Sequence, residues 1–313
     1  MLKKLVEALY EDQTQSWELA KNGFESLKKI QRKELITPFG KHVAQINPAR
    51  IRSSGAKVDT ASIAARPCFL CPHSLPDEQR GIVVLKQWVI LLNPFPILEG
   101  HLTIPLIRHE RQELLPYVKD MCGLALSFRG THEIYFNGAK AGASAPDHMH
   151  FQAAPIGQIP LTSKEQRIQQ ILLQTSSCKI SIVESDPRKI LRWQSKDRGV
   201  IEHLFEVALR TMQRLGMDTD LLNVVLRCDE EGEFVVDFIM RGKHRPECFF
   251  DQGPEGHLIS PGVIDMAGVS VLVRPQDFES ITPELWEGVL REVSLSADNF
   301  EAFINELMES YHG

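Results

Sequence analysis

Apolar residues recur along the chain with two different periods. From Leu2 to about Leu35 they return at helical intervals, which predicts one or two amphipathic helices. Residues 37–72 have little periodicity, and we expect an extended stretch across the surface of a domain. A helix containing Pro116 is then expected within a group of short strands. These predicted strands are Gly81–Leu92, His101–Ile107, His132–Phe136 and His148–Ala153.

The second half has a similar mixture of periods. A polar helix is predicted near Ser163–Gln174 and an amphipathic helix from about Gly199 to Leu215. Three strands are then predicted, at Leu221–Cys228, Glu233–Arg241 and Val269–Arg274. Two helices close the chain, at Pro283–Val293 and Asp298–Tyr311. Both halves share the order helix, antiparallel strands, helix, which is compatible with an ancient duplication. Because strands and helices do not alternate regularly, an α+β fold with antiparallel sheets is expected rather than a doubly wound parallel sheet.

Composition narrows the function classes. The chain has 313 residues, 43% of them hydrophobic, and a formal net charge of -6, which is ordinary for a globular protein of two domains or one duplicated unit. Mild acidity argues against a broad nucleic-acid-binding surface, although local basic sites can still bind small anions. The longest apolar stretch, Gly81–Leu98, contains two prolines and is too interrupted to span a bilayer. We therefore expect a cytoplasmic protein with no membrane or nucleic-acid partner.

The segment from Tyr135 to Gln152 carries the clearest chemical signal. In a strand, side chains alternate between faces, so His148, His150 and Gln152 would lie on one side, with the two histidines roughly 7 Å apart. The preceding residues Gly138–Ser144 offer backbone N–H groups and little side-chain bulk, as an anion site needs. The alternative is an ordinary half-exposed strand. Two histidines and a glutamine in phase after such a loop favour a site.

Four segments together resemble a known family. They are Asn47–Arg52, Leu92–Pro96, Gly138–Gln152 and Gly262–Arg274. In this order they resemble the H-x-H-x-Q nucleotidyltransferase branch of the histidine-triad superfamily, which contains galactose-1-phosphate uridylyltransferase, diadenosine tetraphosphate phosphorylase and GDP-hexose phosphorylases. The resemblance implies two tandem histidine-triad-like halves, with antiparallel sheets and flanking helices. Residues 1–160 would form the catalytic half with its N-terminal helices, and residues 161–313 a degenerate half that closes the pocket.

The same resemblance implies the roles of individual residues. His150 would attack the α-phosphorus of the substrate and form a nucleotidyl-histidine, which an acceptor then attacks. Gln152 and Ser144 would hold phosphate oxygens at this catalytic centre. The implied nucleotide-binding residues are Arg50, Arg52, Asn93, Asn137, Gly142 and Ala143. For the arginines, a solvated surface position is the alternative. Independently of the resemblance, the basic run Arg241–Arg245 at the end of a predicted strand is a candidate site for a sugar phosphate, inorganic phosphate or a distal phosphate, with a solvated turn as the alternative.

Cys68 and Cys71 form a C-x-x-C pair, which in a reducing compartment is more often a metal or redox element than a disulfide. The resemblance implies that His109 and His148 complete a Cys2His2 site, holding a structural zinc ion, with iron as an alternative. His73 and His101 compete with His109 for the third position. A proline-flanked turn without metal is the other interpretation.

Several functions are consistent with this pattern. The first is phosphorolysis of a GDP-hexose or of a dinucleoside polyphosphate, with phosphate as the acceptor. Hexose-1-phosphate uridylyl transfer, with a sugar phosphate as acceptor, is the alternative within the class. A nucleotide-binding sensor without catalysis is the alternative from another class, and a hydrolase is less expected because hydrolytic relatives have a third histidine where Gln152 stands. The base, the sugar and a homodimeric state are left open.

Overall fold

A ten-stranded sheet forms the centre of the protein in a computed structural model that describes residues 2–51, 60–162, 169–183, 186–253 and 256–312. Every pair of neighbouring strands in this sheet is antiparallel. In their order across the sheet, the strands are β3 (Gly81–Val84), β4 (Trp88–Leu92), β5 (Leu102–Pro105), β7 (His150–Pro155), β6 (His132–Asn137), β11 (Leu222–Cys228), β12 (Phe234–Met240), β10 (Lys189–Ser195), β9 (Lys179–Val183) and β8 (Gln169–Gln174).

The two halves of this sheet have the same topology. From one outer edge inward the order is β3-β4-β5-β7-β6, and from the other it is β8-β9-β10-β12-β11. In each half a helix, α5 (Val118–Ser127) or α6 (Arg198–Arg214), leads into the innermost strand. The halves join where β6 pairs with β11, with Tyr135 opposite Val225. This repetition confirms the expected fold class of two tandem α+β halves.

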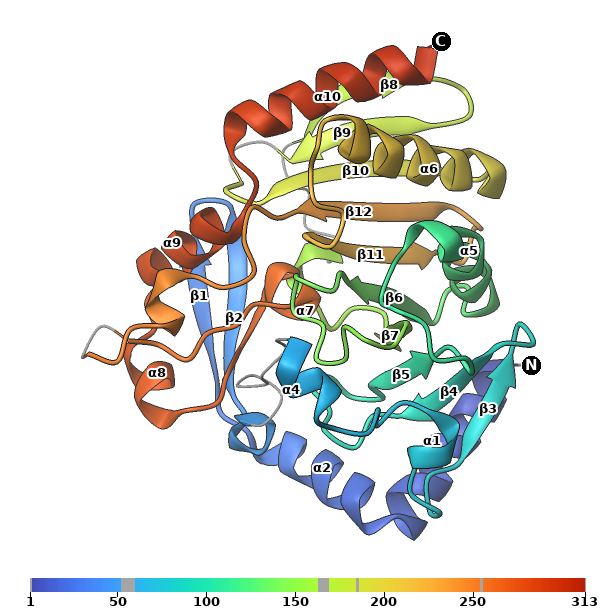
Figure 1. Cartoon of the computed structure of the whole chain (residues 1–313), viewed down its shortest axis with the longest axis vertical. Helices are drawn as coiled ribbons and strands as arrows, with labels where there is room; N and C mark the ends of the chain where they lie inside the picture. Colours follow the sequence, from blue (N-terminus) through green and yellow to red (C-terminus); the bar gives the residue numbers. More distant parts are fainter. Residues whose placement is uncertain (1, 52–59, 163–168, 184–185, 254–255, 313) are drawn as a thin grey trace.

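Separate layers cover the two faces of the sheet (Figure 1). The helices α5, α6 and α10 (Ala297–His312) share one buried apolar cluster with Trp88, Phe151 and Phe238, to which α1 (Leu2–Ser16) and α2 (Glu18–Lys29) also contribute. A second cluster lies on the opposite face, under a small sheet of β1 (Arg32–Thr37), β2 (Gly40–Ile46) and β13 (Val269–Leu272). The remaining helices are η1 (Pro48–Arg50), α4 (Thr60–Ala64), η2 (Pro72–Ser74), η3 (Leu115–Tyr117), η4 (Pro160–Thr162), η5 (Glu247–Phe249), α7 (Val263–Met266), α8 (Pro275–Ser280) and α9 (Pro283–Val293).

The small sheet connects the ends of the chain. Strand β13, from the second half, pairs in parallel with β2, so that Val269 lies opposite Val43. Because parallel neighbours need a long connection, this pairing is invisible in any local sequence window. It places the segment that leads into β13 over the same face of the large sheet on which Gln152 and Ala154 lie.

Local patterns predicted α6, α9 and α10 within two residues, but several other predictions were wrong. Residues 32–46 form the β1–β2 hairpin rather than helix and irregular chain. Residues 169–174 form edge strand β8 rather than the end of a polar helix, because pairing with β9 outweighs a glutamine-rich composition; residues 163–168 of that predicted helix lie outside the described ones. Strands β9 and β10 were not predicted. No helix in the described part of the chain has both the length and the hydrophobicity needed to cross a bilayer.

Arg241, from the predicted basic run, is a buried structural residue. It is 2% exposed, and all five of its N–H groups are used inside the protein. They donate to the carbonyls of Val293, Pro261, Lys243 and His244 and to Oδ1 of Asn223. Arg241 therefore has no donor left for a phosphate, and it ties the end of β12 to the segment that precedes α7.

We expect Arg241→Lys to lower the free energy of unfolding by about 2–3 kcal/mol, because one ammonium group cannot reach five acceptors and leaves buried carbonyls unpaired. Chemical denaturation measures this loss. Arg291→Lys is the control, since Arg291 is 67% exposed in its pair with Glu287 and should change stability by no more than about 0.5 kcal/mol. Equal effects of the two substitutions would contradict the structural role.

Candidate active site and metal-binding cluster

A cavity of about 690 Å³ lies on the face of the first half-sheet that carries His150 and Gln152. This volume is within the usual range of small-molecule sites. Seven of the nine predicted catalytic and nucleotide-binding residues line it: Arg50, Asn93, Asn137, Gly142, Ser144, His150 and Gln152. Of the other two, Ala143 is buried and is not one of the lining residues, and Arg52 lies outside the described residues. Ser260, Gly262, Val263 and Asp265 of the second half complete the wall.

His150 is the first residue of β7, and its ring orientation is fixed. Its Nδ1 lies 2.8 Å from the carbonyl oxygen of His148, so Nδ1 carries the proton and donates it. The lone pair is therefore on Nε2. Burial lowers the pKa of His150 to about 4, although the bond to the carbonyl favours the charged ring. At neutral pH the cavity wall thus contains an uncharged imidazole with a free nitrogen lone pair, the form that acts as a nucleophile.

His101 fixes the amide of Gln152. The backbone N–H of Ile97 donates to His101 Nδ1 over 3.1 Å, so the proton of His101 is on Nε2. That Nε2 lies 2.8 Å from Gln152 Oε1 and donates to it. Since the amide oxygen faces His101, the amide NH2 of Gln152 is available to an anion in the cavity. Burial lowers the pKa of His101 to about 3, which keeps this ring neutral.

From the sequence alone, His101 is expected only as an alternative metal ligand. The structure places it beside Gln152 instead. It is completely buried behind Gln152, and neither His101 nor His73 belongs to the cysteine and histidine cluster. No local pattern indicates the contact with Gln152, because His101 immediately precedes β5, Gln152 lies in β7, and the two residues are 51 positions apart.

The glycine-rich loop packs directly against the second half. Gly142 has φ +95°, and a Cβ atom there would lie 2.5 Å from the Cα of Gly262. Asn137, at the start of the loop, accepts hydrogen bonds at Oδ1 from Val263 N over 2.7 Å and from Asn223 Nδ2 over 2.9 Å. Its side-chain NH2 is therefore the end that remains for a ligand. Glycine at 142 permits the close contact that shapes this side of the cavity.

Arg50 and Asn93 are both linked to the same turn. Asn93 Oδ1 accepts from the backbone N–H of Phe95 over 3.0 Å, and Arg50 Nη1 donates to the Phe95 carbonyl. Burial lowers the pKa of Arg50 to about 10, with Asp265 nearby favouring the cation, so the guanidinium is charged at neutral pH. Two arginines therefore line the cavity, Arg50 and Arg66, together with neutral donors and the buried carboxylic group of Asp265. Arg66 is paired with Asp147, its Nη2 lying 2.8 Å from Oδ1.

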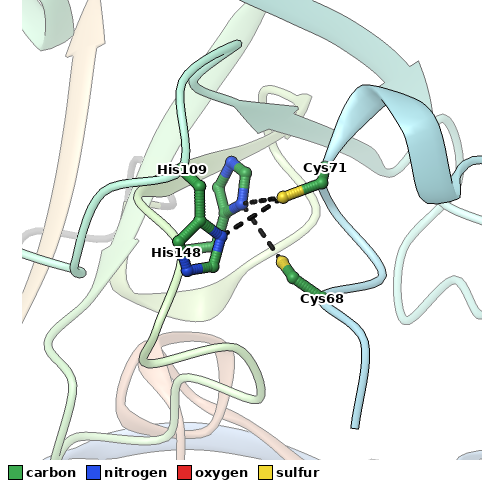
Figure 2. Close-up of side chains that lie close together, drawn as sticks. All are labelled: Cys68, Cys71, His109 and His148. Carbon is green, nitrogen blue, oxygen red and sulfur yellow. Dashed lines mark hydrogen bonds between the residues drawn. The ribbon is translucent and has the colours of Figure 1, made fainter. Parts of the chain in front are cut away.

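The predicted metal ligands Cys68, Cys71, His109 and His148 converge in space (Figure 2). Their ligand atoms all lie within 4.8 Å of one another. Cys68 Sγ is 3.1 Å from His148 Nδ1, and Cys71 Sγ is 3.2 Å from His109 Nδ1. His148 Nε2 donates to the Leu106 carbonyl over 2.7 Å, which leaves its Nδ1 lone pair facing the thiols. A backbone carbonyl on the outer nitrogen is the usual support of a metal-binding histidine.

The donor set fits a tetrahedral zinc ion. Two sulfurs and two imidazole nitrogens at these separations form a closed site of the structural kind. Burial raises the pKa of both thiols, but at Cys68 the hydrogen bond with His148 and those of the backbone outweigh burial, and the pKa falls to about 6. Cys71, beside this thiolate, has a pKa raised to about 11, and a bound cation would favour its deprotonation.

One expectation about this region was wrong. His148, His150 and Gln152 do not share one face, because β7 begins only at His150. His148 lies in the preceding turn, where its ring joins the thiols rather than the cavity. The two histidines of the motif therefore serve two different sites.

Comparisons with known proteins agree with this fold. Residues 9–155 match the family model described as a domain of unknown function, DUF4922, and no curated protein matches the sequence. The structure is similar to yeast Ap4A phosphorylase, with 14% identity, a TM-score of 0.59 and coverage of 89% of this chain and 96% of that one. The same enzyme in complex with Ap4A gives 15% identity, a TM-score of 0.58 and coverage of 90% and 97%. This likeness is one of fold, and it confirms the α+β architecture that the resemblance implies.

The hydrogen bonds predict opposite tautomers for the two histidines at the cavity. His101 should carry its proton on Nε2 and His150 on Nδ1, and long-range ¹H–¹⁵N correlation spectra distinguish these forms. Since both pKa values are lowered by burial, neither ring should take up a proton between about pH 8 and about pH 5. Assignment is made by comparison with His101→Gln and His150→Gln. Finding the same tautomer at both positions would contradict the assigned orientation of Gln152.

Proposed function

We propose that the protein is a nucleotidyltransferase that works through a covalent nucleotidyl-His150 intermediate and transfers the nucleotidyl group to phosphate. The observation that carries this proposal is the neutral imidazole of His150, with its free Nε2 in a cavity beside the NH2 of Gln152. The substrate we propose is a dinucleoside polyphosphate or a nucleoside diphosphate sugar such as a GDP-hexose. Likeness to a phosphorylase that has been crystallised with Ap4A and with AMP supports the first of these.

The reaction would have two balanced displacements. His150 Nε2 attacks the α-phosphorus, the N–P bond forms, and the bond from this phosphorus to its bridging oxygen breaks, releasing a nucleotide or a hexose phosphate. The resulting imidazolium keeps its Nδ1–H on the His148 carbonyl, which stabilises the positive charge. A phosphate oxygen then attacks the same phosphorus, and the P–N bond breaks to give a nucleoside diphosphate.

The surrounding groups would stabilise charge on the transferred phosphoryl group. The Gln152 NH2, held by His101, is aimed at a non-bridging oxygen, and Ser144 with the loop amides would hold the others. Arg50 supplies the nearby positive charge, while Asn93 and Asn137 would contact the nucleotide. Because these donors are fixed by contacts within the protein, they would not need to reorganise as the reaction proceeds.

We propose that residues 1–160 carry the chemistry and that residues 161–313 are a degenerate copy. Strand β12, which occupies the place of β7 in the second half, reads FVVDFIM and contains no histidine. The second half would instead close the pocket through the residues around Gly262 and Asp265.

Two other functions share parts of this site. Uridylyl transfer between hexose phosphates would use the same intermediate with a sugar phosphate as acceptor, so a panel of acceptors distinguishes it from phosphorolysis. A nucleotide-binding sensor would bind nucleotide tightly in calorimetry and turn over no member of the panel.

We also propose that the Cys2His2 cluster binds a structural zinc ion. Bound there, the metal would hold the turn at Cys68–Cys71 against His148, two residues before the nucleophile. Its contribution would be to stability and to the position of the β7 start, because all four protein ligands close the site.

Covalent labelling tests the intermediate. Ap4A or GDP-mannose radiolabelled at the α-phosphorus should label the protein in an acid-labile, base-stable bond when no acceptor is present. We expect His150→Ala to lose this label and to lower turnover by more than about 1,000-fold. His203→Ala, on the exposed side of α6, should retain both. Undiminished turnover by His150→Ala would exclude the proposed mechanism.

Elemental analysis tests the metal. Protein purified without chelator should contain about one zinc per chain, and Cys68→Ser should lose most of it and unfold at lower temperature. Cys178→Ser is the control, because Cys178 is a buried cysteine that lies outside the cluster, in the second half beside Thr175 and Tyr311. Normal folding of Cys68→Ser together with a metal-free wild-type protein would reject a zinc site.

A further inference from the structure

Strands β6 and β7 separate immediately before the nucleophile. Their pairing runs from His132 opposite Pro155 to Tyr135 opposite Gln152 and stops there. The same register, continued, would place Phe136 opposite Phe151 and Asn137 opposite His150. On its other side His150 stands opposite Pro105 of β5, which has no N–H to donate. Met149 O accepts from Leu106 N over 2.9 Å and so faces the β5 side. Because backbone groups of successive strand residues point to opposite sides, the N–H and C=O of His150 face the gap on the β6 side.

The side chain of Gln112 fills this gap. Its Oε1 accepts from the backbone N–H of His150 over 2.8 Å, and its Nε2 donates to the His150 carbonyl over 3.0 Å. The second hydrogen of the same NH2 donates to the carbonyl of Asn137 over 2.8 Å. One side-chain amide thus replaces the missing strand partner of the nucleophile and bridges to β6 as well.

Gln112 is itself held firmly. It is completely buried, and its backbone N–H donates to the Pro146 carbonyl over 3.2 Å. Residues 110–112 also contact the residue before His150, since Met149 N donates to the Glu110 carbonyl over 2.6 Å. The metal ligand His109 lies three positions before Gln112, so the cluster borders on the segment that carries this side chain.

We propose that Gln112 is a positioning residue for the nucleophile, and this inference rests on the proposed function of His150. By holding both backbone groups of His150, Gln112 fixes the direction in which Nε2 enters the cavity. The ring has a second constraint at Nδ1, so its line of attack is determined once the backbone is held. Gln112 touches neither the cavity nor a ligand, and its loss should slow the covalent step without weakening nucleotide binding.

The test compares two buried glutamines. Gln112→Met keeps the length of the side chain and removes its three hydrogen bonds, while Gln112→Glu keeps the shape and the acceptor for His150 N–H. Gln13→Met is the matched control, because Gln13 is also completely buried and bridges the Glu78 carbonyl and the Arg80 N–H outside the large sheet. For each protein, single-turnover labelling by Ap4A gives the rate of the covalent step, and calorimetry with AMP gives the Kd.

We expect both Gln112 variants to form the nucleotidyl-enzyme about 10–100-fold more slowly at saturating Ap4A, with the Kd for AMP changed by less than about 3-fold. Gln13→Met should lose stability but keep the rate. If Gln112→Met does not fold, the isosteric Gln112→Glu carries the same expectation. Wild-type rates in a folded Gln112 variant, or a rate that falls only as binding falls, would overturn the positioning role. Failure of the wild-type protein to become labelled would overturn the proposed function as well.

Discussion

The hydrogen bond from His150 Nδ1 to the carbonyl of His148 is the constraint on which the rest of the site depends. It determines which ring nitrogen has the lone pair, and it spans only two residues of chain. The ring of His148, meanwhile, is held by Cys68 and by the Leu106 carbonyl. One residue therefore belongs to the Cys2His2 cluster through its ring and orients His150, the proposed nucleophile, through its backbone. A displacement of the cluster would be transmitted to His150 without passing through the cavity.

Burial gives this arrangement its chemical character. His101 and His150 are both almost inaccessible, and burial lowers the pKa of each far enough that neither ring is charged at neutral pH. A neutral ring has one donor and one acceptor nitrogen, so a single backbone contact on each decides the tautomer. His101 Nδ1 accepts from a backbone N–H, so its Nε2 is a donor, whereas His150 Nδ1 donates to a backbone carbonyl, so its Nε2 is an acceptor. The ring of His101 therefore orients the amide of Gln152, and the ring of His150 presents a nitrogen lone pair to the cavity.

The sequence contained the parts of the site that are close together along the chain. The spacing of Cys68 and Cys71 predicted a metal or redox element, and the H-x-H-x-Q resemblance added His109, His148, His150 and Gln152. The supporting contacts could not be predicted, since Gln112 reaches His150 over 38 positions and His101 reaches Gln152 over 51. The alternation of side chains predicted a strand that begins at His148. In the structure the chain turns at His148, whose ring contacts the thiols, and β7 begins at His150. Contacts between residues far apart in the chain, such as those of His148 with Cys68 and of His150 with Gln112, leave no pattern in a short stretch of sequence. The start of β7 depends on these contacts.

The two halves show how one topology supports different interiors. In the first half, the face of β7 that carries His150 and Gln152 borders a cavity, whereas β12 in the second half is buried along its whole length. There Arg192 Nε donates to Asp237 Oδ1 over 2.6 Å, and this ion pair lies inside the protein. Such a pair needs close packing around it, because an unpaired buried charge is costly. The contribution of the second half to the cavity comes instead from the chain that leads into β13. The first half supplies His150, the proposed nucleophile, and the residues that hold it, while the second supplies the wall that brings Gly262 against Gly142.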